Sequence, residues 1–97
     1  MISKKDKFRL RRLANKLKPL VIIGKDGLSE NMIESIRNAI KTHELIKISI
    51  LKTYEGLPTK DLAELICSTI DAELIFVVGR VITIYKKNKD INKYEVK

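Results

Sequence analysis

The spacing of apolar residues changes several times along this chain, and this alternation limits the fold more than any other feature. Three segments have the three- and four-residue spacing of an amphipathic helix: 4–17, 29–42 and 58–70. Four shorter segments are continuously apolar or alternate every second residue, as strands do: 20–23, 46–50, 74–78 and 81–85. Strand–helix–strand units favour parallel neighbours joined by right-handed crossovers. The order α-β-α-β-α-β-β therefore predicts an α/β fold with one mixed four-stranded sheet and packed helices, and leaves the strand order open.

The predicted strands differ in how much of each we expect to be buried. Residues 20–23 are apolar throughout, so we expect that strand to be buried on both faces. In 46–50, three isoleucines alternate with Lys47 and Ser49, which is typical of a strand with one polar or open face. The dipeptide Gly79-Arg80 predicts a tight hairpin turn between the last two strands.

Residues that commonly begin and end helices lie beside the helical segments. Lys18-Pro19 ends the first one, because a residue before proline avoids the α region. We expect Ser29 to cap the second helix and Thr59 to cap the third.

Length and composition indicate one small domain. We expect a single domain over residues 1–88 and a polar tail over 89–97 that frays, because only Ile91 and Tyr94 could anchor it. One cysteine, Cys67, excludes an intrachain disulfide and a cysteine metal cluster. No apolar run approaches the ~18 residues of a membrane helix, and no apolar stretch follows the first lysines as in a signal peptide. We therefore expect a cytoplasmic protein.

The positive charge is concentrated at the start of the chain. The net charge is +8, and residues 1–28 alone contribute +7. In the first helical segment, Lys5, Arg9, Arg12 and Lys16 fall on one face, and Lys18 follows them. A one-sided basic patch is the expected footprint of a polyanion binder. The alternative is a basic protein that its charge merely keeps soluble.

A short glycine turn, Gly24-Lys25-Asp26-Gly27, joins the first strand to the second helix. Glycine allows a close backbone approach or a positive φ, and a helix N-terminus attracts anions. Lys25 adds a full charge, although the same four residues also suit an ordinary turn. With the basic helix beside it and Arg80 at the hairpin tip, the turn predicts a phosphate contact. We expect the basic helix and the turn to meet at one end of the domain.

Residues suited to catalysis are few. The lone histidine, His43, falls where a helix gives way to a strand, and Cys67 next to Ile66 is typical of a buried, inert thiol. The chain has no Walker motif, nucleophile elbow or paired His and Cys ligands. We therefore expect no enzyme activity, cofactor, metal or small-molecule substrate.

The few aromatic residues affect how a nucleic acid could be recognised. They do not support a sheet that stacks several bases, so recognition would depend on backbone and shape. Phe8 lies beside the basic face, and it could either stack on a base or pack against the tail.

Four ordered motifs together resemble the CRM domain, named for chloroplast RNA splicing and ribosome maturation, from about residue 3 to Tyr85. They are Leu17-Lys18-Pro19, the segment Ile23-Gly24-Lys25-Asp26-Gly27-Leu28-Ser29, the segment His43-Glu44-Leu45-Ile46-Lys47-Ile48, and Val78-Gly79-Arg80-Val81. The short, free-standing chain is similar to the bacterial YhbY-like members. The resemblance implies a fold like the C-terminal domain of translation initiation factor three with an added N-terminal helix.

The resemblance also implies a function. Members of the family bind RNA, and the bacterial ones are linked to precursors of the large ribosomal subunit. Their G-x-x-G loop corresponds to Gly24–Gly27, and their basic first helix to the one with Arg9, Arg12 and Lys16. Lys86 departs from the arginine that is usual after the last strand, which weakens the case for a bidentate contact there.

The leading hypothesis is an RNA-binding protein that holds rRNA of large-subunit precursors during ribosome assembly. The candidate RNA-binding residues are Lys5, Arg9, Arg12, Lys16, Lys18, Gly24, Lys25, Asp26, Gly27 and Arg80. The main alternative is a protein-interaction module whose basic face docks an acidic ribosome-associated partner. A DNA-binding protein is less favoured because no recognition helix is evident. A membrane-surface helix is also less favoured, because the first helix needs its short apolar stripe for the core.

Overall fold

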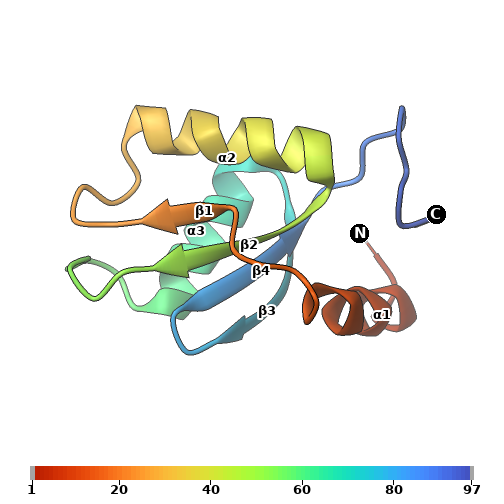
Figure 1. Cartoon of the computed structure of the whole chain (residues 1–97), viewed down its shortest axis with the longest axis horizontal. Helices are drawn as coiled ribbons and strands as arrows, with labels where there is room; N and C mark the ends of the chain where they lie inside the picture. The colour runs from red at the N-terminus through yellow and green to blue at the C-terminus, as the bar shows by residue number, and fades with distance from the viewer. Residues whose placement is uncertain (1, 97) are drawn as a thin grey trace.

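The computed structural model describes residues 2–96, and in this range it contains three helices and four strands in the predicted order (Figure 1). These elements are α1 (Lys4–Ala14), β1 (Val21–Ile23), α2 (Glu30–His43), β2 (Leu45–Ile50), α3 (Thr59–Ile70), β3 (Glu73–Val78) and β4 (Val81–Tyr85).

The strands form one mixed sheet with the order β1-β2-β4-β3. β1 and β2 are parallel and are joined through α2, as expected for a strand–helix–strand unit. β4 lies antiparallel between β2 and β3. Val78 pairs with Val81, which confirms the hairpin turn at Gly79-Arg80. The sheet thus has β1 and β3 as its two edges.

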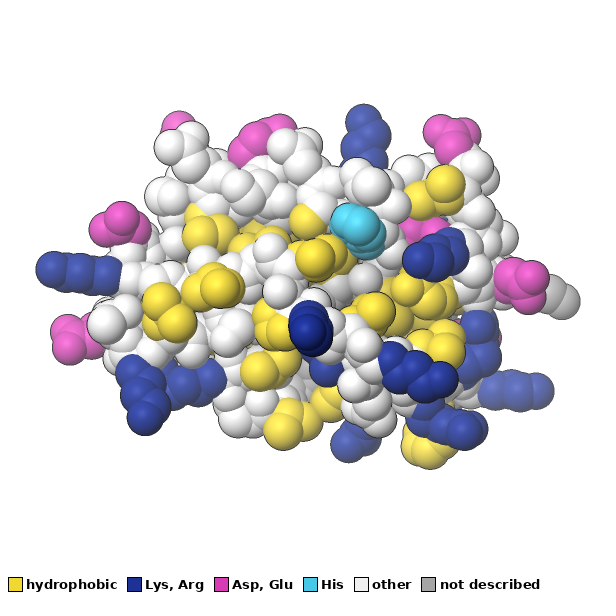
Figure 2. All heavy atoms as spheres, in the orientation of Figure 1, with side chains coloured by type: hydrophobic (Ala, Val, Ile, Leu, Met, Phe, Trp, Pro, Cys, Tyr) yellow, Lys and Arg dark blue, Asp and Glu magenta, His cyan; other side chains and the backbone are white. Residues whose placement is uncertain are grey.

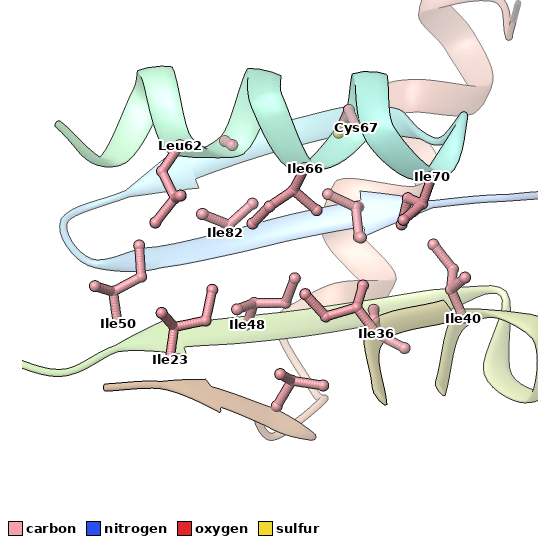
Figure 3. Close-up of a cluster of buried hydrophobic side chains, with 14 residues drawn as sticks. Ile23, Ile36, Ile40, Ile48, Ile50, Leu62, Ile66, Cys67, Ile70 and Ile82 are labelled. Carbon is pink, nitrogen blue, oxygen red and sulfur yellow. The ribbon is translucent and has the colours of Figure 1, made fainter. Parts of the chain in front are cut away.

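The larger core lies between the sheet and the two helices α2 and α3 (Figure 3). Ile48 of β2 and Ile82 of β4 are neighbours in the sheet and are fully buried. Ile66 of α3 and Ile36 of α2 point into the same cluster. Burial of a side chain of this size contributes roughly 1.5–3 kcal/mol, so this layer supplies most of the hydrophobic stabilisation.

A second, smaller core lies on the other face of the sheet, under α1. Leu10 and Ala14 of α1 pack on Leu45 and Tyr85, which are adjacent in sequence to residues of the larger core and point the opposite way. Since Leu45 is the first residue of β2, α1 covers only the end of the sheet where β2 begins (Figure 1). The rest of this face is mostly uncovered: Val78 is exposed and Lys47, Ser49 and Val81 are half-buried, whereas Thr83 is buried.

The observed helix ends differ in part from the predicted ones. Ser29 caps α2 as predicted, and its hydroxyl accepts a hydrogen bond from the Met32 N–H at 3.1 Å. The prediction that Thr59 caps α3 is wrong, because Thr59 is already helical and Pro58 occupies the cap position. α1 ends at Ala14, three residues earlier than predicted, and its last turn tightens: the Lys16 N–H donates to the Leu13 carbonyl at 3.2 Å.

The prediction that the first strand is buried on both faces is also wrong. Ile22 is 55% exposed, whereas Val21 and Ile23 on either side of it are buried. β1 is an edge strand, and Ile22 points to the face opposite to the larger core, which contains Val21 and Ile23.

The prediction that the tail frays is wrong as well. Val96 is buried in the smaller core. Glu44, buried directly after α2, accepts hydrogen bonds on its carboxylate from the N–H groups of Asn88 at 2.9 Å and Lys93 at 2.6 Å. The Arg9 guanidinium donates to the Tyr94 carbonyl at 2.5 Å. The buried carboxylate of Glu44, the Arg9 guanidinium and the burial of Val96 together hold the tail against the domain, and the sequence alone did not reveal these contacts.

Replacing Glu44 should release the tail. Glu44→Ala leaves two N–H groups of the tail without an acceptor, which we expect to lower the free energy of unfolding by about 3 kcal/mol. Amide hydrogen exchange should accelerate at Asn88 and Lys93. Glu34→Ala, at an exposed position on α2, serves as the control. Unchanged exchange at both tail amides would contradict this role of Glu44.

Candidate nucleic-acid interface

The candidate RNA-binding residues form two groups at opposite ends of β2 (Figure 1). α1 carries the first group and packs on Leu45 at the start of β2. The glycine turn follows Ile23, which pairs with Ile50 at the end of β2. The prediction that the basic helix and the turn meet at one end is therefore wrong. They are separated by the length of the strand because β1 runs parallel to β2 between them.

The first group is mostly open to solvent. Lys5 and Arg12 are exposed on α1, and Lys16 and Lys18 are exposed in the connection that follows. Arg9 differs from these four, because it is half-buried. Its guanidinium donates to Asp6 at 3.3 Å as well as to the tail. Arg9 therefore has a structural role. The sequence did not indicate this role, because the hydrogen-bond partner, Tyr94, is 85 residues away.

The glycine turn has an exposed tip and a packed base. Lys25 and Asp26 are exposed, and the Gly27 N–H donates to the Gly24 carbonyl at 3.0 Å. Gly27 has a φ of +62° and is buried, and a Cβ there would lie 3.1 Å from the ring of Tyr54. The fold thus requires glycine at position 27.

Gly24 is not required in the same way. Its φ is not positive, and a Cβ there would lie 3.5 Å from Leu51, an ordinary contact. Packing therefore does not explain why position 24 is a glycine. The absence of a side chain leaves the backbone of Gly24 half-exposed beside Lys25.

The turn does not lead directly into the helix. Leu28 and Ser29 separate Gly27 from the first helical residue, Glu30, and the Ser29 hydroxyl already accepts one of the free helix N–H groups. An anion at the turn would therefore meet the turn backbone and Lys25 before the end of α2.

Two further segments adjoin the turn. Tyr54, in the loop after β2, supports Gly27 with its ring and accepts a hydrogen bond from the Leu57 N–H at 3.0 Å. Arg80, at the exposed hairpin tip, donates to the Leu51 carbonyl at 3.2 Å. Tyr54 is not among the predicted RNA-binding residues, although Gly56 two residues later indicates a close approach of another group to the backbone. A Cβ at Gly56 would lie 2.4 Å from the Tyr54 hydroxyl.

An open sheet face lies between the two groups. Figure 2 shows Lys and Arg side chains at both ends of this side of the molecule, and hydrophobic side chains with a few more Lys and Arg side chains between them. Ile22 and Val78 are among the exposed apolar residues of the strands. The Arg11 guanidinium lies over the ring of Phe76, 4.7 Å from its centre, so a cation already covers one face of this half-buried ring. Phe8 is 63% exposed, and both stacking on a base and packing against the tail remain predictions.

The residues that could serve in catalysis or metal binding lie apart from one another in the described part of the chain. His43 is exposed at the end of α2, beside Lys18 and Tyr94. Within residues 2–96, no three His, Cys, Asp or Glu side chains converge as metal ligands, and no helix in the same range has the length and hydrophobicity to cross a membrane. Burial, together with the nearby carboxylates of Glu73 and Glu64, raises the pKa of the Cys67 thiol to about 11.

Three glycine variants test the geometry of the turn. Gly79→Ala introduces only a positive-φ penalty, because no atom lies within 4 Å of the added Cβ, and should destabilise the fold by about 1 kcal/mol. Gly27→Ala adds the contact with Tyr54 and should cost at least about 2 kcal/mol. Gly24→Ala should leave the free energy of unfolding nearly unchanged. Urea unfolding measures the free energy of unfolding of all three variants. Equal losses of this free energy at positions 24 and 27 would contradict a special requirement for glycine at position 27.

The raised pKa of Cys67 predicts an unreactive thiol. A rise from 9.0 to about 11 lowers the thiolate fraction at pH 8 about a hundredfold, and burial slows the reaction further. Reaction with Ellman's reagent should be slow in the native protein and fast in guanidinium. Because the folded state disfavours the thiolate, this group stabilises the fold below about pH 9, and the contribution falls as pH rises toward 11. Equal reaction rates in the native protein and in guanidinium would contradict the unreactive state of the Cys67 thiol.

The chain is similar to curated proteins over nearly its whole length. It is 34% identical over 96 residues to YqeI of Bacillus subtilis, named a probable RNA-binding protein, and covers 99% of each chain. It is 35% identical over 97 residues to a probable RNA-binding protein of Methanocaldococcus jannaschii and covers 72% of that relative. A relative from Pseudomonas aeruginosa, 27% identical over 92 residues, is also named a probable RNA-binding protein.

The structural and family comparisons agree with these relatives. The solution structure of a hypothetical protein from Staphylococcus aureus, described as a candidate RNA-binding protein, superposes with a TM-score of 0.80 at 36% identity. The alignment covers 100% of this chain and 98% of that one. Residues 2–86 match the CRS1/YhbY (CRM) domain. The chain therefore belongs to the CRS1/YhbY (CRM) domain family.

Proposed function

We propose that this protein binds RNA through its open sheet face, with α1 at one end and the glycine turn at the other. The observation that carries the proposal is the exposure of six of the seven candidate cations: Lys5, Arg12, Lys16, Lys18, Lys25 and Arg80. The names of the relatives support the same chemistry. The molecule is 37 Å long, so one RNA segment lying along it would meet both groups.

The contacts in this proposal go mainly to phosphates. Lysine and arginine neutralise phosphates and release counterions, which drives binding independently of sequence. At the turn, the half-exposed backbone of Gly24 lets a sugar–phosphate chain come close to Lys25. The covered ring of Phe76 argues against a sheet that reads several bases. The protein would thus recognise the shape of a folded RNA.

The RNA we propose is rRNA in precursors of the large ribosomal subunit, held without catalysis in the cytoplasm. The family resemblance supports this target, and a small binding domain without a catalytic constellation among residues 2–96 suits an assembly role. Crosslinking in cells, followed by mapping of the crosslinked nucleotides, would identify the target.

Removing two charges from α1 should weaken RNA binding and its salt dependence. We choose Lys5→Gln with Arg12→Gln and leave Arg9 intact, because Arg9 also holds the tail. The slope of log K against log salt should become less steep by about 0.7–0.9 for each lost phosphate contact. Fluorescence anisotropy with a structured rRNA fragment at several salt concentrations measures it.

The matched control is Lys60→Glu, which changes the net charge by the same amount at an exposed position on α3. It should leave affinity close to that of the wild-type protein. If the control weakened binding as much as the α1 variant, net charge alone would account for the interaction. If nuclease treatment of a lysate left an acidic partner bound, the protein-interaction alternative would replace RNA binding.

A further inference from the structure

A third group of cations, separate from those on α1 and at the glycine turn, surrounds a cleft on the helix-covered side of the sheet. This helix-end cleft, of about 320 Å³, lies where the second half of α2, the end of α3 and the segment after β4 meet. Ile40 and Ile70, both buried, form its floor. Five cationic side chains and one amide form its walls: Arg37, Lys41, Lys86, Lys87, Lys89 and Asn88. No carboxylate of the described residues lines the cleft.

Hydrogen bonds hold the walls of the helix-end cleft in place. Lys86 donates to the Ile70 carbonyl at 2.8 Å, and Arg37 donates to the Thr69 carbonyl at 3.2 Å, so both satisfy free carbonyls at the end of α3. The Asn88 amide donates to the Lys41 carbonyl at 2.8 Å. The cleft is therefore formed before any ligand arrives.

The remaining cations are available to a ligand. Lys41, Lys87 and Lys89 are exposed around the cleft. The nearby carboxylate of Glu44 is buried and accepts two backbone N–H groups of the tail. Asp90 follows Lys89 in the sequence but does not line the cleft. The opening therefore presents positive charge above an aliphatic floor.

This combination suits one nucleotide. A base can lie over the two isoleucines and against the aliphatic stems of the surrounding lysines, while its phosphates meet their ammonium groups. The volume is at the lower end of small-ligand sites, which favours a single nucleotide over a folded acidic partner. A purely electrostatic patch would not need the apolar floor.

The helix-end cleft is separate from the interface described above. α1 packs under Leu45 and Tyr85, whereas Ile40 and Ile70 belong to the core on the opposite face. We propose that the cleft binds an unpaired nucleotide of the RNA, as a contact additional to the open sheet face. This proposal rests on the proposed RNA-binding function. The cleft could not be predicted from the sequence, because Arg37 and Lys41 are more than 40 residues away from the lysines after β4.

The test is a titration of the ¹⁵N-labelled full chain with a single-stranded RNA hexamer, followed by amide chemical shifts. We expect shifts at Lys41, Lys87 and Asn88, and binding that is about five- to tenfold weaker for Lys87→Gln with Lys89→Gln. Both substitutions are at exposed positions and leave Arg37 and Lys86 in place. Lys60→Glu is again the charge-matched control and should bind like the wild type.

An abasic hexamer of equal charge tests the role of the base and should bind the cleft several-fold more weakly. Equal binding of the abasic and normal hexamers would overturn the nucleotide assignment. Shifts confined to α1 and the glycine turn would overturn the cleft and leave the proposed function standing. No shifts anywhere with the hexamer, together with no binding of the structured fragment, would overturn both. Tighter binding of a poly-glutamate peptide at the cleft amides would identify a protein-docking site instead.

Discussion

The burial of β2, along its length on one face and only at its start on the other, is the constraint on which the rest of the structure depends. Ile46 and Ile48 require a cover on one face, and Leu45 requires one on the other. α2 and α3 provide the first cover, and α1 with the tail provides the second. Because α1 is short, it covers only the start of β2 and leaves the remaining face open. The separation of the α1 cations from those at the glycine turn follows from this arrangement.

The buried carboxylate of Glu44 couples the tail to this arrangement. It lies between the end of α2 and the start of β2, where both cores meet, and it holds the segment from Asn88 to Lys93. That segment places Tyr94 beside Arg9 and Val96 beneath α1. The tail thus helps to hold the basic helix, and it also forms one wall of the helix-end cleft.

The sequence predicted the element order, the hairpin and the cap at Ser29, because spacing and turn chemistry act over a few residues. It did not predict the strand order, the tail or the separation of α1 from the glycine turn, because these depend on contacts between distant residues. Arg9 shows the difference. Its helical position placed it on the basic face, but its hydrogen bond to Tyr94 depends on the folded tail. For the same reason Tyr54, which supports Gly27, was missed.

The central claim is that α1 and the glycine turn contact one RNA at the same time. A double-mutant cycle on a structured rRNA fragment tests it directly, combining Arg12→Gln on α1 with Lys25→Gln in the turn. If both ends touch the same RNA, each substitution weakens binding, and their free-energy losses add, because the sites are far apart. If one substitution had no effect in the presence of the other, or either had none alone, the two groups would not form one interface.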